Sequence, residues 1–413
     1  MNLSSGHLPW SHTLPNVPTY NFLQEDAHCE FLIVGGGMGG AATSYQLSLH
    51  GAGADTILID KRAVGGGSTH ANTGLLQVAN DKSLTSCMNT FGEKQGVLFY
   101  SLCRDALHGL LKLRDHLDID PYILSRTSLL YASTPEDVPV LKKEYENLRT
   151  HGFETEFWDQ SRIASAYGFS KSAALYSPGD AEVNPFRLVH GLIAKASSQG
   201  VRVYENCEAM SYEFKEAGVI CHTKTGRIFA KKVIFAMGYE TQEMKKDCGA
   251  FLVNTYAVMT RPLKEFPAKW HERSLIWETS RPYLYFRTTH DGRIIAGGKD
   301  EALTDPEERE IRVHTQSQKL LSEIQLLFPE ISNLELEYSW GAVFGTTHDG
   351  LPYIGAHPRY PHSYFVEGYG GNGTVYSMIA ADLLTDTLAG KHRPELDLFS
   401  LTRSTKPSPT DSK

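Results

Sequence analysis

The segment that most restricts the fold of this chain is a short apolar run that ends in a cluster of glycines. The apolar residues Phe31–Val34 lead directly into Gly35–Gly40, and residues 41–50 that follow are good helix formers. A second apolar run, Thr56–Ile59, ends at Asp60. A strand, a helix and a strand within about thirty residues predict a βαβ unit whose strands belong to a buried parallel sheet.

The glycine spacing matches the G-x-G-x-x-G fingerprint of dinucleotide-binding folds. Gly35 would permit the tight turn, Gly37 would let a pyrophosphate approach the backbone, and Gly40 would let the helix pack closely on the strand. The N-terminus of that helix would offer free N–H groups to the phosphates. Asp60 lies twenty residues after Gly40 and would accept hydrogen bonds from a ribose hydroxyl, which disfavours the 2′-phosphate of NADP.

A second glycine-rich loop follows Asp60 directly. Residues 61–76 are rich in glycine and in small hydroxyl side chains. Such a loop is able to wrap an extended cofactor and reach toward its far end, and an NAD site does not need it.

Three blocks together resemble the D-amino-acid-oxidase-type superfamily of FAD-dependent oxidoreductases, which includes glycine oxidase and sarcosine oxidase. These are VGGGMGG with ILIDKR (34–40 and 57–62), GGGSTHANTGLLQ (65–77), and the glycine-rich stretch 340–374. The resemblance covers about residues 30–403. It implies an α/β fold, in which a Rossmann-like FAD-binding domain with a central parallel sheet is interleaved with an α+β substrate domain built on a mixed or antiparallel sheet.

The order of the blocks predicts that the two domains alternate along the chain. We expect the FAD-binding domain to comprise 29–90, 181–245 and 336–403, and the substrate domain to comprise 91–180 and 246–335. Residues 1–28 and 404–413 are polar and contain several prolines, so we expect them to be loose terminal extensions.

The resemblance also implies which residues contact FAD. The helix that begins near Thr374 would stabilise negative charge on the reduced flavin through its N-terminus, and the segment around Ala209 would pass the adenine. We expect FAD to be non-covalent. His70 is one residue further from Gly74 than in the histidine-linked pattern, and a covalent bond there is the alternative. The predicted set is Gly35, Gly37, Met38, Gly39, Gly40, Asp60, Lys61, Arg62, Gly67, Ser68, Thr69, His70, Asn72, Thr73, Gly74, Leu75, Ala209, Gly238, Gly370, Gly371, Asn372, Gly373 and Thr374.

A candidate substrate site comes from the predicted hairpin at 283–298, which has Asp-Gly at its tip. Alternation places Tyr283, Tyr285 and Arg287 on one face, and a guanidinium is suited to binding a carboxylate at two points. The resemblance implies that Arg287 anchors a substrate carboxylate with Tyr285 beside it, and that His348 lines the pocket. The alternative is that Arg287 is a surface charge at the end of the strand, paired with Asp or Glu.

These observations predict an FAD-dependent oxidoreductase that dehydrogenates a small amino acid or secondary amine to the imine, with oxygen or another acceptor reoxidising the flavin. An FAD-dependent 2-hydroxy-acid dehydrogenase and a non-catalytic flavoprotein subunit of a larger complex are the alternatives. The sequence makes no prediction of the oligomeric state.

Composition excludes several other classes. The 413 residues carry a net charge of −8, which argues against nucleic acid as a partner. The six cysteines show no metal-ligand spacing, so we expect free thiols and no metal site. No apolar run reaches the length of a membrane span, and we expect a cytoplasmic protein.

Overall fold

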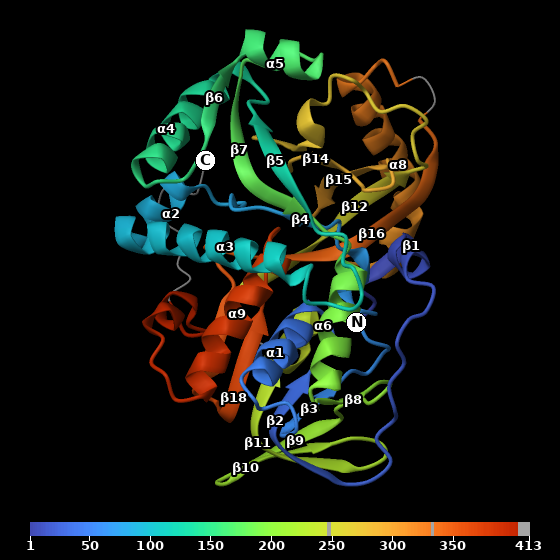
Figure 1. Cartoon of the computed structure of the whole chain (residues 1–413), viewed down its shortest axis with the longest axis vertical. Helices are drawn as coiled ribbons and strands as arrows, with labels where there is room; N and C mark the ends of the chain where they lie inside the picture. The colour runs from blue at the N-terminus through green and yellow to red at the C-terminus, as the bar shows by residue number, and fades with distance from the viewer. Residues whose placement is uncertain (246–248, 332–333, 404–413) are drawn as a thin grey trace.

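The computed structural model describes residues 1–245, 249–331 and 334–403, and the predicted extension 404–413 lies outside them. Two sheets with their covering helices make up the molecule, one above the other along its long axis (Figure 1). No helix within the described ranges is both long and apolar enough to cross a membrane.

The lower sheet contains the predicted βαβ unit. Its strand order is β17-β18-β11-β2-β3-β8, with β10 paired to β11 and β9 paired to β10. The five strands from β18 to β8 run parallel, and β17 is an antiparallel edge strand. The bounds are β2 (Ala27–Val34), β3 (Thr56–Ile59), β8 (Arg202–Tyr204), β9 (Ser211–Lys215), β10 (Gly218–His222), β11 (Arg227–Phe235), β17 (Tyr353–His357) and β18 (Tyr360–Glu367).

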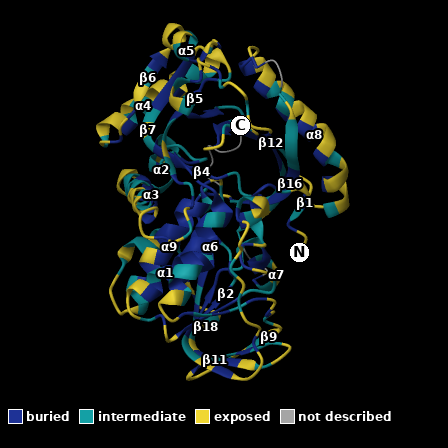
Figure 2. Cartoon of the chain, turned by 45° about the vertical axis from the view of Figure 1, so that its right-hand side comes forward, coloured by how far each residue is buried: buried dark blue, intermediate teal, exposed yellow. Residues whose placement is uncertain are grey.

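Three helices cover one face of this sheet. They are α1 (Met38–Leu49), α6 (Pro185–Ser198) and α9 (Gly373–Leu388), and α1 packs against the other two. All three are largely buried (Figure 2). Helices on a parallel sheet of continuous apolar strands are the arrangement that the resemblance implied, so the Rossmann-like part of the predicted fold is confirmed.

The upper sheet is mixed. Its order is β1-β16-β12-β15-β14-β13-β5-β7-β4, with β6 on β7; most pairs are antiparallel, and β13 runs parallel to β5. The predicted hairpin is present as β14 paired with β15. The bounds are β1 (Ser4–His7), β4 (Leu75–Leu76), β5 (Leu124–Tyr131), β6 (Glu156–Asp159), β7 (Ala173–Glu182), β12 (Ala250–Thr260), β13 (Leu275–Glu278), β14 (Tyr285–Thr288), β15 (Ile294–Glu301) and β16 (Leu336–Thr347).

The remaining helices surround the upper sheet or join it to the lower one. α8 packs on β12, β15 and β16 with its outer side exposed, and α3 contacts both α9 and β7. The bounds are α2 (Leu84–Phe91), α3 (Glu93–Leu113), α4 (Val138–Thr150), α5 (Gln160–Tyr167), α7 (Thr241–Met244) and α8 (Pro306–Leu327).

Three segments lie elsewhere than the sequence predicted. The N-terminal segment is not a loose extension, since β1 pairs with β16 and the side chain of Trp10 is only 3% exposed. β4 and β16, which we assigned to the FAD-binding domain, are strands of the upper sheet. β1 pairs along the edge that β16 would otherwise leave open, which ties the N-terminal segment to this sheet.

Candidate active site

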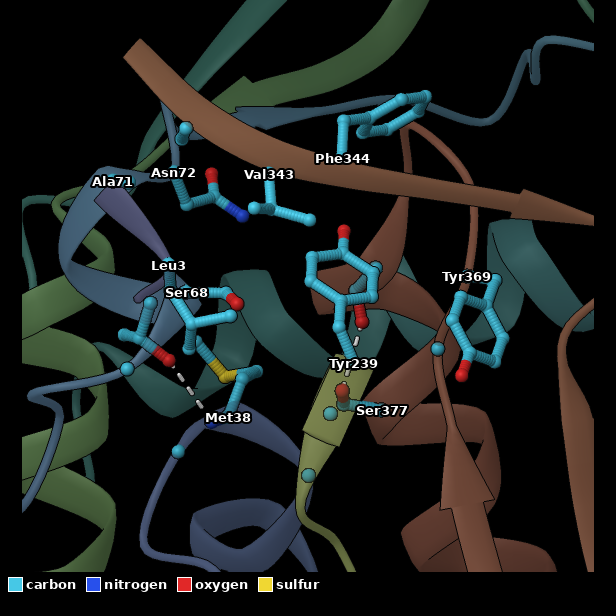
Figure 3. Close-up of a pocket in the computed structure, with 18 of the residues that line it drawn as sticks. Leu3, Met38, Ser68, Ala71, Asn72, Tyr239, Val343, Phe344, Tyr369 and Ser377 are labelled. Atoms are coloured by element: carbon cyan, nitrogen blue, oxygen red, sulfur yellow. Dashed lines mark hydrogen bonds between the residues drawn. The ribbon is translucent and has the colours of Figure 1, made fainter. Parts of the chain in front are cut away.

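A cavity of about 600 Å³ is lined by residues from both sheets. Figure 3 shows Leu3 from the N-terminal segment, Met38 from α1, Asn72 from the second glycine-rich loop and Phe344 from β16 around this space. These residues are far apart in the sequence, so the cavity exists only in the folded chain.

The first glycine turn and Asp60 form one hydrogen-bonded unit. The N–H groups of Gly36 and Arg62 donate to the Asp60 carboxylate at 2.6 and 2.7 Å, and burial raises the pKa of that carboxyl. A Cβ on Gly40 would overlap the carbonyl oxygen of Gly35, whereas a Cβ on Gly37 would meet only the Thr69 hydroxyl oxygen, at 3.3 Å. Gly40 therefore serves the close packing of the helix, and Gly37 leaves room toward the cavity.

Beside Asp60, three positively charged groups contact the carboxylate of Glu240. Arg62 donates to both Glu240 oxygens at 2.8 and 2.9 Å, and the Lys61 ammonium and the N-terminal amino group lie 3.0 and 3.1 Å from it. Burial alone would raise the pKa of this carboxyl, but these bonds lower it to about 2. Glu240, Lys61 and Arg62 all line the cavity.

The second glycine-rich loop is held on both sides. The Thr69 hydroxyl oxygen accepts a hydrogen bond from the Met38 N–H at 3.1 Å, which joins the loop to α1. On the other side, the indole N–H of Trp340 donates to the carbonyl of Ala71 at 2.9 Å, and that of Trp10 donates to the carbonyl of Asn72 at 2.7 Å. The loop includes a short 3₁₀ helix, η2 (Ser68–Ala71).

The N-terminus of α9 opens onto the same cavity. Gly371 N–H donates to the carboxylate of Asp81 at 2.8 Å, and the Asn372 amide donates to the carbonyl of Gln77 at 2.6 Å. The Thr374 side chain is 2% exposed, and its hydroxyl has no hydrogen-bond partner within the described residues.

These features fit an extended dinucleotide. Neither α1 nor α9 has a side-chain cap on its N-cap residue in the described structure. Apart from the Met38 N–H, which Thr69 accepts, first-turn N–H groups of both helices are therefore available to phosphate or flavin oxygens. The buried, unpartnered hydroxyl of Thr374 and the open space above Gly37 are further positions that a ligand would fill. FAD would place its adenosine near Asp60 and its isoalloxazine ring near the start of α9.

Most of the predicted cofactor residues line this cavity, and three of them do not. Gly40 packs on β2, and Gly74 is enclosed by the Val183 carbonyl. His70 is directed away: its ring stacks on Phe186 with centroids 5.2 Å apart, and its Nε2 accepts a hydrogen bond from Ser11 N–H at 3.2 Å. This position of the His70 ring does not support a covalent bond to the flavin.

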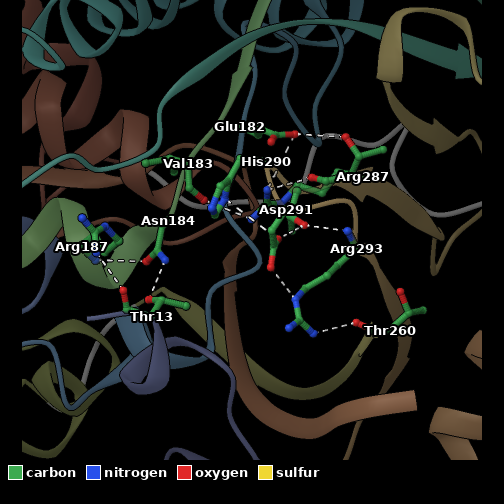
Figure 4. A network of polar contacts seen from close by, with 12 residues as sticks. Thr13, Glu182, Val183, Asn184, Arg187, Thr260, Arg287, His290, Asp291 and Arg293 are labelled. Carbon is green, nitrogen blue, oxygen red and sulfur yellow. Dashed lines mark hydrogen bonds and ion pairs between the residues drawn. The ribbon is translucent and has the colours of Figure 1, made fainter. Parts of the chain in front are cut away.

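Arg287 does not occupy the position expected of a carboxylate anchor. It is 2% exposed and absent from the cavity lining. Its guanidinium donates to the carbonyls of Thr73, Thr288 and Val183 at 2.6, 3.0 and 3.1 Å, and lies 3.8 Å from Glu182 (Figure 4). Because each of its three guanidinium nitrogens donates to a backbone carbonyl, Arg287 is placed to support the second loop. It faces an acidic residue, as the alternative expected, but it is buried and not a surface charge.

The two other predicted substrate residues differ from each other. Tyr285 lines the cavity, and its hydroxyl oxygen accepts a hydrogen bond from Thr73 at 3.3 Å. His348 is exposed and outside the lining, with its ring against Phe251 at 5.3 Å.

Several lining residues had no signal in the sequence. Asp81, Trp277 and Asp300 come from a loop and two strands that carry no motif, and β16 contributes Val343 and Phe344. Tyr283 shares the face predicted for Tyr285, and this alternation is the one pattern that pointed to this part of the cavity.

Comparison with known proteins agrees with the fold. The family model "FAD dependent oxidoreductase" matches residues 30–387. Glycine oxidase from Geobacillus kaustophilus (strain HTA426) is 26% identical over 396 residues, covering 90% of this chain and 96% of that protein. Gamma-glutamylputrescine oxidoreductase from Escherichia coli (strain K12) is 24% identical over 391 residues, covering 90% and 86%. The crystal structure of glycine oxidase from Geobacillus kaustophilus has the same fold, with a TM-score of 0.79 at 23% identity over 92% of this chain and 100% of that one.

Proposed function

Because the chain belongs to the family of FAD-dependent oxidoreductases, we propose that it oxidises the C–N bond of a small amine or amino acid to the imine. The observation that carries this proposal is the continuity of the cavity. It runs from the dinucleotide turn, past the start of α9, to a group of aromatic and acidic side chains on the upper sheet. A substrate bound there would lie against the flavin end of the cofactor.

The names of two similar proteins support an amine as substrate. Glycine and gamma-glutamylputrescine, which appear in those names, both carry an amine nitrogen on a carbon that bears hydrogen. When bound, FAD would supply the acceptor for a hydride from that carbon.

The contribution of the protein is orientation and exclusion of water. Tyr285 and Trp277 form adjacent parts of the wall, since they are paired across β13 and β14. Burial raises the pKa of Tyr285, so its hydroxyl stays protonated and neutral. The 2-hydroxy-acid alternative relied on Arg287 as a carboxylate anchor, and it loses that basis because Arg287 does not line the cavity and each of its guanidinium nitrogens donates to a backbone carbonyl.

Anaerobic reduction of the FAD-loaded protein tests the proposal. We expect at least one compound among glycine, sarcosine, proline, D-amino acids and simple primary or secondary amines to bleach the visible flavin absorbance. Subsequent mixing with oxygen or an artificial dye would identify the class of acceptor. Bleaching by 2-hydroxy acids alone would replace the proposal with the hydroxy-acid reading, and no bleaching by any compound would favour the non-catalytic subunit.

A further inference from the structure

One end of the cavity, the substrate end, is formed by Asp81, Trp277, Tyr283, Tyr285 and Asp300. It adjoins both loops that face the flavin position. The Tyr283 hydroxyl donates to Asp81 at 2.8 Å, and the other oxygen of Asp81 accepts from Gly371 N–H at 2.8 Å. Tyr285 accepts from Thr73 of the second loop. Any molecule held here is therefore next to the position proposed for the reacting ring.

The aromatic residues of the substrate end form a connected wall. The ring centroids of Trp277 and Tyr283 lie 6.1 Å apart in an edge-to-face arrangement, and those of Tyr283 and Tyr285 lie 5.9 Å apart. Aromatic faces carry negative electrostatic potential and attract cations.

The charges at this end are negative. Among the described residues that line the cavity, Lys61 and Arg62 are the only cationic ones, and both are bound to Glu240 beside the dinucleotide turn. The substrate end instead holds Asp81 and Asp300.

An arginine near the substrate end does not make the charge of its lining positive. Arg281 is exposed and outside the lining, and its guanidinium donates to the Asp81 carbonyl and to carbonyls of residues 278–280. Those bonds hold it on the backbone. A carboxylate entering the substrate end would therefore meet two like charges, with the backbone-bound Arg281 outside the lining as the opposing positive charge.

Trp277 would contribute the face of its ring, and not its N–H group, to the binding of a cation. Trp277 is 6% exposed and lines the cavity, and its indole N–H has no hydrogen-bond partner within the described part of the chain. A buried donor without an acceptor is rare in folded proteins and costs free energy. An ammonium group offers no acceptor to this N–H, so the part of Trp277 that would contact a cation is the face of its ring.

We propose that the substrate end binds an amine that carries a second cationic nitrogen, with Asp81 and Asp300 as counter-ions and the rings of Trp277, Tyr283 and Tyr285 around the ammonium group. This assignment rests on the proposed function, which it narrows from amines and amino acids in general to diamine-like molecules. The second nitrogen binds to the carboxylates, and the reacting nitrogen extends toward the start of α9.

The pKa of Asp300 is raised in the chain without a ligand, and a bound cation would oppose this rise. Burial raises the pKa, a hydrogen bond with Thr255 lowers it, the nearby negative charge of Asp81 raises it again, and the positive charge of Arg281 lowers it. Two neighbouring carboxylates that repel each other gain most from a shared cation, because the cation removes their repulsion as well as forming its own contacts.

The test compares three compounds of equal chain length on the FAD-loaded protein: 1,4-diaminobutane, n-butylamine and 4-aminobutyrate. We expect 1,4-diaminobutane to reduce the flavin anaerobically at a half-saturating concentration about tenfold or more below those of the other two.

The variants test the two carboxylates. Asp300→Asn, which keeps the shape and removes the charge, should raise the half-saturating concentration of 1,4-diaminobutane on the order of 10- to 100-fold and change the n-butylamine value by less than about threefold. Asp81→Asn should act in the same direction. Glu146→Gln, on the exposed surface of α4, is the control that should change neither value.

A binding measurement separates this assignment from the proposed reaction. Butane-1,4-bis(trimethylammonium) has no nitrogen lone pair and cannot form an imine, so its binding is read from the visible flavin spectrum without turnover. We expect saturable binding that Asp300→Asn weakens at least about tenfold. Absence of binding, or equal binding by the variant, overturns the dication site, as does tighter use of 4-aminobutyrate than of 1,4-diaminobutane. Binding with no reduction by any amine or amino acid supports the dication site and overturns the proposed reaction alone.

Discussion

The indole N–H of Trp10 donates a 2.7 Å hydrogen bond to the backbone carbonyl of Asn72. Trp10 precedes the first strand of the lower sheet, and Asn72 lies in the glycine-rich loop that lines the cavity. Through this bond a segment that resembles a loose tail in the sequence becomes part of the support of the cofactor loop.

We predict that Trp10→Phe weakens FAD binding. The substitution keeps most of the buried ring and removes the donor, at a cost of about 1–2 kcal/mol, which corresponds to roughly a 5- to 30-fold higher Kd for FAD by fluorescence titration. Trp270→Phe is the matched control, because Trp270 is also 3% exposed and donates to the Ser274 carbonyl at 2.8 Å, but in the core of the upper sheet. Equal FAD affinities in the two variants would contradict a supporting role for Trp10.

A second prediction concerns the glycine turn. Gly40→Ala should lower the free energy of unfolding of the FAD-free protein by about 2–4 kcal/mol, because the new Cβ would overlap the carbonyl oxygen of Gly35. Gly109→Ala, in the exposed middle of α3 with no atom near the new Cβ, should instead stabilise the protein by about 0.5–1 kcal/mol. Urea unfolding of both variants makes the comparison, and a neutral Gly40→Ala would show that helix and strand are less closely packed there.

Arg287 provides a third prediction. Since its donors are bonded to three carbonyls, Arg287→Lys should lower the free energy of unfolding by about 2–4 kcal/mol. The ratio of half-saturating concentrations for glycine and for a simple amine should stay the same, because the side chain does not line the cavity. A loss confined to carboxylate-bearing substrates, measured by anaerobic flavin reduction, would restore Arg287 as the anchor.

The fourth prediction is a pH dependence of stability. The pKa of Glu240 is about 2 in the folded chain, below the ordinary value of 4.5. The stabilisation is therefore fully present above pH 4.5 and is lost as the pH falls toward 2, up to about 3 kcal/mol. Glu240→Gln should be less stable than the parent at pH 7, and the difference should shrink between pH 4.5 and 2 in urea unfolding experiments. A difference that stays constant with pH would show that the Glu240 charge does not stabilise the fold.

The sequence predicted the nucleotide-binding half of the molecule well, because its signals are local. Gly35, Gly37 and Asp60 belong to one βαβ unit, and the second loop follows it directly, so their roles depend on neighbours a few residues away. It predicted the substrate half poorly. Alternation placed Tyr285 and Arg287 on one face, but only Tyr285 reaches the cavity.

The sequence by itself determined the fold class and the cofactor, since glycine spacing, apolar strands and the acidic residue at a strand end act through backbone geometry that short segments impose. Only the tertiary structure decided what surrounds that cofactor. Asp81 and Tyr283 are bonded although two hundred and two residues separate them, and Trp10 supports a loop sixty-two residues away. The positions of such side chains depend on how the two sheets pack, and no periodicity within one segment contains that information.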